Sequence, residues 1–334
     1  MARSVLVVGG AGYIGSHAVK ALRTRGDDVV VYDDLSAGHR SAARFATALV
    51  EGNIHDLARL RNAMRQYDVD VVMHFAAWAS VGESVRDPIG YYRNNVTGSL
   101  TVLEAMAGER VPFFVFSSTA AVFGNPVTTP ITEDHPKAPI NPYGETKLAV
   151  ERALPHYEKA YEIRSSVLRY FNAAGADPDG DLGEDHAPEL HLIPRAIDAA
   201  AGRSTFQIFG DDYPTPDGTC LRDYIHVTDL GDAHLLALDA LRGGADSSHY
   251  NLGNGRPTSV REVVDTIERV VGKPVPAAIA PRREGDPAVL FASSDRIKSE
   301  LGWRPRFEDV DTIVSTAWRW REAHPSGYGD GARG

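Results

Sequence analysis

Short apolar runs alternate with longer amphipathic segments through the first half of the chain. Runs rich in β-branched residues, each bounded by polar or turn residues, occupy 4–8, 28–32, 49–51, 71–74, 113–117 and 164–170. Helical patterns lie between them, at 15–25, 57–67, 94–107 and 145–159. This alternation predicts an α/β fold, in which helices cover both faces of a doubly wound parallel sheet.

The pattern changes after residue 170. Loops rich in Gly, Asp and Pro follow at 177–188 and 211–218, with helical segments between them. We therefore expect a first domain over 1–171 and a smaller C-terminal α/β substrate domain over 172–334, with later returns of the chain to the sheet near 223–252. The tail, SGYGDGARG, is expected to fray because it offers no core-forming residues.

Composition narrows the classes of function. The chain has 334 residues, a net charge of −10 and no run of five or six lysines and arginines. This balance argues against a nucleic-acid partner or an anionic membrane surface. No apolar run approaches a membrane span, and the one near the N-terminus is too short for a signal peptide, so a cytoplasmic location is expected.

Cysteine and histidine usage bears on metals and redox chemistry. Cys220 is the only cysteine, which excludes an internal disulfide and a cysteine zinc cluster. The 12 histidines show neither a His-x-x-x-His nor a His-Glu-x-x-His spacing with acidic partners, so no metal site is expected.

A glycine pattern follows the first predicted strand. In VLVVGGAGYIGSH, Gly9 permits a tight turn, Gly12 lets backbone N–H groups approach a pyrophosphate, and Gly15 allows close packing of the next helix on the strand. Asp33 ends the second strand eighteen residues after Gly15, where a carboxylate accepts from a ribose 2′-hydroxyl and repels a 2′-phosphate. The pattern predicts a Rossmann-type domain that binds NAD in preference to NADP.

The stretch NPYGETKLAVE begins a predicted helix. Asn141 suits the N-cap and Pro142 the first helical position, so Tyr143 and Lys147 share one helix face. Taken alone, the pair is better explained by an amphipathic helix that half-buries the ring and leaves the ammonium in solvent.

Together, Gly9-x-x-Gly12-x-x-Gly15 and Tyr143-x-x-x-Lys147 resemble the extended short-chain dehydrogenase/reductase family. Further stretches are similar, in order and spacing from Ser4 to about Tyr328, to the UDP-glucose 4-epimerases of that family: HFAAWASVGES, YYRNNV, FSSTAAVFG, RYFNAAG, GTCLRDYIHV, YNLG and PRREGDPA. The resemblance implies an isomerase that interconverts UDP-glucose and UDP-galactose. The sugar is oxidised at carbon 4, the 4-keto sugar rotates, and the hydride returns to its other face.

The resemblance also implies roles for residues. Tyr143 is the expected general base, Lys147 lowers the pKa of that phenol and holds the nicotinamide ribose, and Thr119 hydrogen-bonds the 4-hydroxyl of the sugar. The residues expected around NAD are Gly9, Gly12, Tyr13, Ile14, Gly15, Asp33, Asn53, Ile54, Phe75, Ala76, Ala77, Asn94, Lys147 and Phe171. Those expected around the UDP-sugar are Thr119, Tyr143, Asn172, Phe209, Arg222, Arg283, Asp286 and Leu290, with Arg222 and Arg283 on the diphosphate.

Three positions depart from the pattern of relatives. Asn53 stands where many relatives have an aspartate that contacts adenine, which predicts somewhat weaker NAD retention. Ala79 replaces a lysine that some members direct at the cofactor. Leu290 replaces a tyrosine that closes the pocket to N-acetyl sugars in some members, so some epimerisation of UDP-N-acetylglucosamine is expected.

Other functions stay open. The catalytic residues do not distinguish a 4-epimerase acting on another UDP-sugar, such as UDP-N-acetylglucosamine or UDP-xylose. A sugar-nucleotide 4,6-dehydratase is disfavoured because Ala120 and Ala121 follow Thr119, where an acid and a base are needed. A non-catalytic NAD-binding regulator is possible on fold alone. The family resemblance further implies a homodimer paired through helices 94–107 and 144–160.

Overall fold

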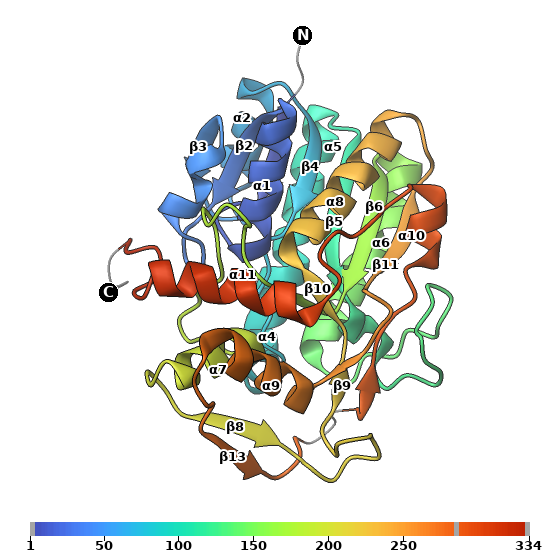
Figure 1. Ribbon diagram of the computed structural model, residues 1–334. Coiled ribbons are helices and arrows are strands. Elements are labelled where there is room, and N and C mark those ends of the chain that lie inside the picture. The colour runs from blue at the N-terminus through green and yellow to red at the C-terminus, as the bar shows by residue number, and fades with distance from the viewer. Residues whose placement is uncertain (1–3, 284–286, 331–334) are drawn as a thin grey trace.

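A seven-stranded parallel sheet forms the centre of the computed structural model, which describes residues 4–283 and 287–330 (Figure 1). Its strand order is β11-β6-β5-β4-β1-β2-β3, and every neighbouring pair is parallel. The strands are β1 (Ser4–Val8), β2 (Asp28–Asp33), β3 (Ala48–Glu51), β4 (Val69–His74), β5 (Phe113–Thr119), β6 (Arg164–Tyr170) and β11 (Ser248–Leu252). The predicted fold class is confirmed.

Alternate residues of each strand feed two hydrophobic cores. In β1, Val5 and Val7 face one side of the sheet and Leu6 and Val8 the other, and all four are fully buried. The first side packs against α1 (Tyr13–Arg25) and α8 (Val227–Arg242), which lie side by side in Figure 1. The second side packs against α2 (Leu57–Gln66), α5 (Gly98–Glu109) and α6 (Pro142–Tyr161).

A third core lies beyond the carboxyl ends of the strands, in the lower part of Figure 1. It is built mainly from α7 (Leu192–Ala200), β8 (Phe206–Phe209), α9 (Val260–Val271), β13 (Ala277–Ala280) and α11 (Val310–Ala323). Short strands connect this part to the sheet: β7 (Asn172–Ala174), β9 (Leu221–Arg222), β10 (Tyr224–His226), β12 (Thr258–Ser259) and β14 (Val289–Leu290). Between them the chain returns to the sheet as α8 and β11, and α10 (Asp295–Glu300) packs on β11. The division into domains 1–171 and 172–334 stays a prediction.

The segment before α5 contains three short helical pieces, namely α3 (Val81–Arg86), α4 (Pro88–Tyr91) and the π-helix η2 (Tyr92–Thr97). Asn95 of η2 is buried, and its side chain hydrogen-bonds both backbone groups of Trp78. It accepts from the Trp78 N–H at 2.9 Å and donates to the Trp78 carbonyl at 3.0 Å. Its amide also donates to the Thr146 hydroxyl at 3.1 Å. The π-helix therefore holds the first turns of α6 against the end of β4. The 3₁₀ helices η1 (Arg40–Phe45) and η3 (Ala120–Phe123) are the remaining helical elements of the described residues.

The tail is better ordered than the sequence predicts, as far as residue 330, the last described. The Tyr328 hydroxyl lies 3.0 Å from the Gly183 nitrogen, and its backbone N–H donates to Asp185 at 3.0 Å. Its ring lies 4.8 Å from that of His39, centroid to centroid. A single tyrosine offers both an apolar ring and a hydroxyl, which is enough to dock an otherwise glycine-rich segment.

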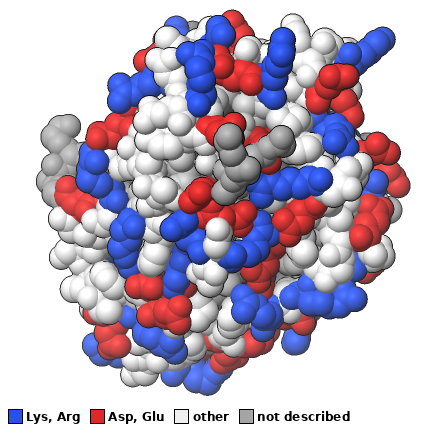
Figure 2. Space-filling view, turned by 90° about the horizontal axis from the view of Figure 1, so that it is seen from above, with Lys and Arg blue, Asp and Glu red and all other residues white. Residues whose placement is uncertain are grey.

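The surface carries charges of both signs. On the face seen in Figure 2, basic and acidic side chains are interspersed and neither sign covers a large continuous area. Among the helices of the described residues, none is both long enough and apolar enough to cross a lipid bilayer.

Candidate active site

The predicted site residues gather where the carboxyl ends of the central strands face the lower part of the molecule (Figure 1). The strand order reverses between β1 and β4, since the chain runs from β1 outward to β2 and β3 and only then crosses to β4. Such a switch point leaves a crevice in which doubly wound sheets bind ligands. Gly9 follows β1, Phe75 follows β4, Thr119 ends β5, and Phe171 follows β6.

The glycine turn leaves no room for side chains on its protein side. Gly9 has φ +82°, and a Cβ there would lie 2.4 Å from the Ala76 nitrogen. A Cβ on Gly15 would lie 2.2 Å from the Gly9 oxygen, so α1 packs directly on the turn. Gly12 is the N-cap of α1 and has no side chain to cap the helix. A Cβ there would meet no atom nearer than 3.5 Å, so the helix start is open to an incoming anion.

The end of β2 is tied to this turn by Asp33. Its carboxylate accepts from the Ala11 backbone N–H at 2.9 Å and from the Leu35 N–H at 2.8 Å. Asp33 is buried, and a carboxylate has further lone pairs beyond these two bonds. The arrangement orients the carboxylate beside the glycine turn, as a ribose-binding residue requires.

Further predicted cofactor residues follow the strands next to the glycine turn, Phe75 and Ala76 after β4 and Asn53 after β3. Phe75 and Ala76 both donate their backbone N–H to the Val8 oxygen, at 2.8 and 3.0 Å, which keeps the chain after β4 close to the turn. Asn53 uses its amide locally, because Oδ1 accepts from the His55 N–H at 3.0 Å and Nδ2 donates to Asp34 at 2.8 Å. A contact of Asn53 with adenine therefore has to share the amide oxygen with that backbone bond.

The other cofactor residues lie around these. Ile54 packs in the core beneath α5, and Ile14 packs against the core on the α1 side. Ala77 precedes Trp78, whose backbone is hydrogen-bonded to Asn95. Asn94 donates to the Asn95 side chain at 3.0 Å. The Tyr13 hydroxyl donates to the Gly175 oxygen at 2.6 Å, joining the start of α1 to the chain after β7.

Thr119, Tyr143 and Lys147 come together although 24 residues separate the first two. The Asn141 side chain accepts from the Gly144 N–H at 2.9 Å, which starts α6 and presents Tyr143 on its first turn. The Thr119 hydroxyl lies near the phenol of Tyr143 and acts to lower its pKa. One turn further along α6, the Lys147 ammonium donates to the Ser117 carbonyl at 2.9 Å and lies 5.0 Å from the centre of the Phe116 ring.

Burial is the largest influence on the pKa values of Tyr143 and Lys147. It raises the pKa of Tyr143 above its ordinary value, and the Thr119 hydroxyl offsets only part of that rise. It also lowers the pKa of Lys147 to about 7, against a smaller opposing effect of the Glu151 carboxylate. An adjacent ammonium was expected to lower the phenol pKa. The protein's own groups raise it instead, because burial outweighs the other effects on Tyr143.

Residues that the sequence did not single out support this group. Glu151 lies one turn after Lys147 and forms a buried ion pair with Arg169 of β6 at 2.7 Å, and it also accepts from Ser118 at 2.6 Å. The Ser117 hydroxyl hydrogen-bonds the Tyr170 phenol. Tyr170 and Arg169 lie within the RYFNAAG stretch, which was noted as a motif without a role for either residue.

The predicted substrate residues fall into two groups. Leu290 packs on a small buried cluster that includes Ala120 and Leu148, the sequence neighbours of Thr119 and Lys147. Phe171, predicted at the cofactor, packs on the same cluster.

The others lie along β7, β8 and β9. Asn172 donates through its amide to the Asp223 carbonyl at 2.9 Å, and Arg222 pairs with Leu290 across β9 and β14. The Arg283 guanidinium lies 4.1 Å from the centre of the Phe209 ring. Asp286 lies outside the described residues.

The parallel sheet has a glycine turn at its switch point, a carboxylate at the end of the second strand and a Thr–Tyr–Lys group at the ends of β5 and α6. Together these features define a dinucleotide-dependent enzyme. The turn fits NAD on its own geometry, through the open helix start at Gly12 and the oriented carboxylate of Asp33.

Comparison with known proteins specifies the class. Residues 5–253 match the NAD dependent epimerase/dehydratase family. The UDP-glucose 4-epimerase of Lacticaseibacillus casei is 48% identical over 98% of this chain and 99% of its own length. The structure of UDP-glucose 4-epimerase from Brucella ovis in complex with NAD superposes with a TM-score of 0.93 at 52% identity, covering 95% of this chain and 98% of that one. The UDP-Glc/GlcNAc 4-epimerase of Campylobacter jejuni gives 0.84 at 39% identity, covering 96% and 99%.

The chain belongs to the NAD-dependent epimerase/dehydratase family, within the group of UDP-glucose 4-epimerases. The resemblance noted in the sequence is confirmed, as are the assignment to the isomerases and the expectation of NAD as cofactor.

Proposed function

We propose that this enzyme interconverts UDP-glucose and UDP-galactose by reversible oxidation at carbon 4 of the sugar. The observation that carries the proposal is the proximity of Thr119 at the end of β5 to Tyr143 at the start of α6, with Lys147 one helical turn further along α6 and bonded to the Ser117 carbonyl. Bound NAD supplies the hydride acceptor for carbon 4 and, when oxidised, a positive charge that favours the phenolate.

Tyr143 holds and releases the proton of the 4-hydroxyl. Its side chain is half-buried, which restricts the access of water to the transferred proton, and Thr119 orients both the phenol and an incoming sugar hydroxyl. Both residues lie on regular elements, at the end of β5 and the start of α6, which keeps their separation nearly constant.

Lys147 is a buried amine whose pKa lies near neutrality. Its contact with the Ser117 carbonyl uses one of three ammonium donors, and the remaining donors suit the ribose hydroxyls of the cofactor. The Glu151–Arg169 pair stabilises α6 one turn beyond Lys147 and so maintains its position.

Arg222 and Arg283 are proposed to hold the diphosphate, since the fork of a guanidinium matches phosphate oxygens. Arg222 extends from β9 beside Leu290, and Arg283 lies on Phe209 at the end of β8. A sugar held mainly through its nucleotide is free to turn between the two half-reactions, as epimerisation requires.

The test is to incubate the purified protein with UDP-galactose, add no nucleotide, and follow UDP-glucose by chromatography. Formation of UDP-glucose supports epimerisation by a retained cofactor. If turnover appears only after NAD is added, retention is weak, and the shared amide oxygen of Asn53 is the first place to examine. Absence of turnover with NAD present would contradict the proposal.

The second candidate function is 4-epimerisation of a broader range of UDP-sugars, and Leu290 is the residue that favours it. Its side chain packs on the same buried cluster as Phe171, a cluster that includes Ala120 and Leu148. Leucine lacks the ring and hydroxyl of tyrosine and leaves more space for a 2-acetamido group. We expect measurable epimerisation of UDP-N-acetylglucosamine, with the ratio of kcat/KM values for the two sugars as the readout.

A 4,6-dehydratase finds no support. Ala120 and Ala121 follow Thr119 in η3, and neither can donate a proton to a departing hydroxyl at carbon 6. A 4-keto-6-deoxy product in the same assay would contradict this interpretation.

We also propose that the enzyme is a homodimer paired through α5 and α6. The elements around them expose large apolar side chains, among them Ile89, Tyr92 and Tyr161 at 72%, 45% and 57% of their full area. A monomeric mass by light scattering at micromolar concentration would count against the pairing.

A further inference from the structure

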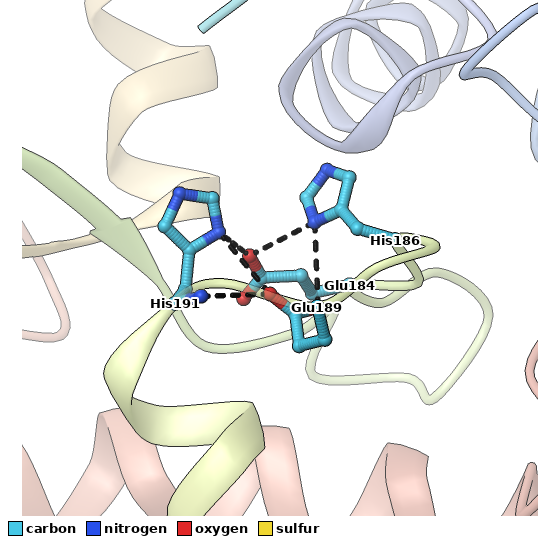
Figure 3. A group of neighbouring side chains, drawn as sticks. All are labelled: Glu184, His186, Glu189 and His191. Atoms are coloured by element: carbon cyan, nitrogen blue, oxygen red, sulfur yellow. Dashed lines mark hydrogen bonds and ion pairs between the residues drawn. The ribbon is translucent and has the colours of Figure 1, made fainter. Parts of the chain in front are cut away.

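Four potential metal ligands meet in the loop between β7 and α7. They are Glu184, His186, Glu189 and His191, and Figure 3 shows the two imidazoles on either side of the two carboxylates. One ligand atom from each residue lies within 4.8 Å of all the others. The Glu-x-His-x-x-Glu-x-His spacing differs from both histidine patterns considered in the sequence, which is why it suggested no site.

Three nitrogen–oxygen separations in the cluster are close to those around a tetrahedral ion. His186 Nδ1 lies 3.3 Å from Glu184 Oε1 and 3.4 Å from Glu189 Oε2, and His191 Nδ1 lies 3.5 Å from Glu189 Oε1. Zinc–nitrogen and zinc–oxygen bonds of about 2.0–2.2 Å place tetrahedral ligand atoms about 3.3–3.6 Å apart. His191 Nδ1 and Glu184 Oε1 form a 2.5 Å hydrogen bond, which has to open by about 1 Å to reach that separation.

Backbone hydrogen bonds and burial hold the side chains of this cluster in place. Glu189 Oε1 accepts from the backbone N–H groups of Leu190 and His191, at 2.8 and 2.9 Å, which orients its carboxylate. Glu184 is buried, and His186 Nδ1 is a buried nitrogen that makes no hydrogen bond of good geometry. The His191 side chain is 54% exposed and provides an entry path for an ion.

We propose that Glu184, His186, Glu189 and His191 bind one Zn²⁺ ion. Two imidazoles and two carboxylates suit zinc, whereas Mg²⁺ and Ca²⁺ prefer oxygen ligands alone. Four protein ligands close the coordination shell, so the ion is structural. It stabilises the loop that leads into α7, beside the edge-on contact of the His186 ring with Tyr13 at the start of α1, 6.2 Å between ring centres.

Protons compete with zinc for the imidazoles. Burial lowers the pKa of both histidines, but the two carboxylates outweigh it and raise the pKa of His186 to about 9 and that of His191 to about 10. Without a metal the cluster is therefore a set of His–Glu ion pairs, and zinc has to displace two protons to bind.

A second cluster, of Asp177, Asp179 and Asp181, is a different case. The Lys20 ammonium contacts all three carboxylates, at 2.6, 2.9 and 2.8 Å, and occupies the position that a cation would take.

The test is a zinc titration of chelator-treated enzyme against a chromogenic zinc indicator. The wild type is expected to bind one Zn²⁺ per chain, and Mg²⁺ should not compete. His191→Ala, at a half-exposed position, should weaken binding by about two orders of magnitude or more, and Glu184→Gln should do the same. The matched control is His156→Ala, an exposed histidine on α6, which should bind as the wild type does.

Cobalt gives an independent readout. Co²⁺ added to the zinc-free wild type is expected to produce the visible absorption of a tetrahedral ion, and His186→Ala should abolish it while circular dichroism stays native. Absence of saturable zinc binding in the wild type would overturn the proposal. So would retention of full affinity in His191→Ala and Glu184→Gln, because the ion would then lie elsewhere.

Discussion

Replacing Tyr143 by phenylalanine removes one oxygen atom from the proposed proton acceptor and leaves the ring in place. Loss of a general acid–base typically slows a reaction by about 10²–10⁴-fold, which corresponds to about 2.7–5.4 kcal/mol on the barrier. The structural cost is smaller. A hydroxyl's polar contact within the protein is typically worth about 1 kcal/mol, and the Asn141 cap that starts α6 remains.

The assay measures initial rates of UDP-galactose conversion together with bound NAD released on denaturation. Tyr143→Phe should lose kcat by the factor above with KM for UDP-galactose nearly unchanged, because the nucleotide anchors are untouched. NAD content and the urea midpoint should stay close to those of the wild type.

Tyr157→Phe is the matched control, on the same helix but beside Tyr161 at 5.6 Å between ring centres, and it should leave kcat unaltered. A kcat for Tyr143→Phe within about threefold of wild type would refute the assignment of Tyr143 as the acid–base group. A loss of turnover that merely tracked lost NAD or unfolding would refute it as well.

Three further changes test other parts of the site. Burial depresses the pKa of Lys147 to about 7 from an ordinary value of 10.5, so the folded state resists its protonation. The wild type should therefore gain stability relative to Lys147→Met as pH rises from about 7 towards 10.5, and a flat difference in urea unfolding across that range would show that the amine is not buried as described. Leu290→Tyr should reduce kcat/KM for UDP-N-acetylglucosamine by about tenfold or more while sparing UDP-galactose, and equal losses on both sugars would exclude a selective gate. Arg169→Met leaves the Glu151 carboxylate buried without its partner and should lower the free energy of unfolding by about 3–5 kcal/mol. Adding Glu151→Gln should recover most of that loss in urea unfolding, and a double variant as unstable as the single one would argue against an unpaired charge as the cause.

Periodicity along the chain was enough to predict the architecture. The alternation of β-branched runs with amphipathic segments located the strands of the first half to within two residues at either end, since side chains in a parallel sheet are buried on both faces. The three-glycine spacing predicted the turn because only glycine fits so close to Ala76 and to the start of α1.

The sequence supplied candidate residues for the site, but it did not indicate the directions of their pKa shifts. The spacing of Tyr143 and Lys147 placed them on one helix face, whereas their contacts with Thr119 and the Ser117 carbonyl depend on how α6 packs against β5. The raised pKa of Tyr143 could not be inferred from an adjacent lysine. It depends on how completely α6 and β5 bury the phenol.

Contacts between distant segments were not visible in the sequence. Tyr328 docks on Gly183 and His39, so a tail judged by its glycines alone is held by one aromatic side chain. Glu184 and His191 are seven residues apart, and only the path of the loop between β7 and α7 brings their ligand atoms together.

The sequence by itself determined the class of fold and the glycine turn, and it supplied the candidates for the reacting groups, because helix period, strand period and glycine spacing are set within a few residues of chain. The tertiary structure decided which of these groups meet, which are removed from water and in which direction their pKa values move. Those properties depend on burial and on atoms contributed by segments far apart in the chain, and both arise only when the helices pack on the sheet.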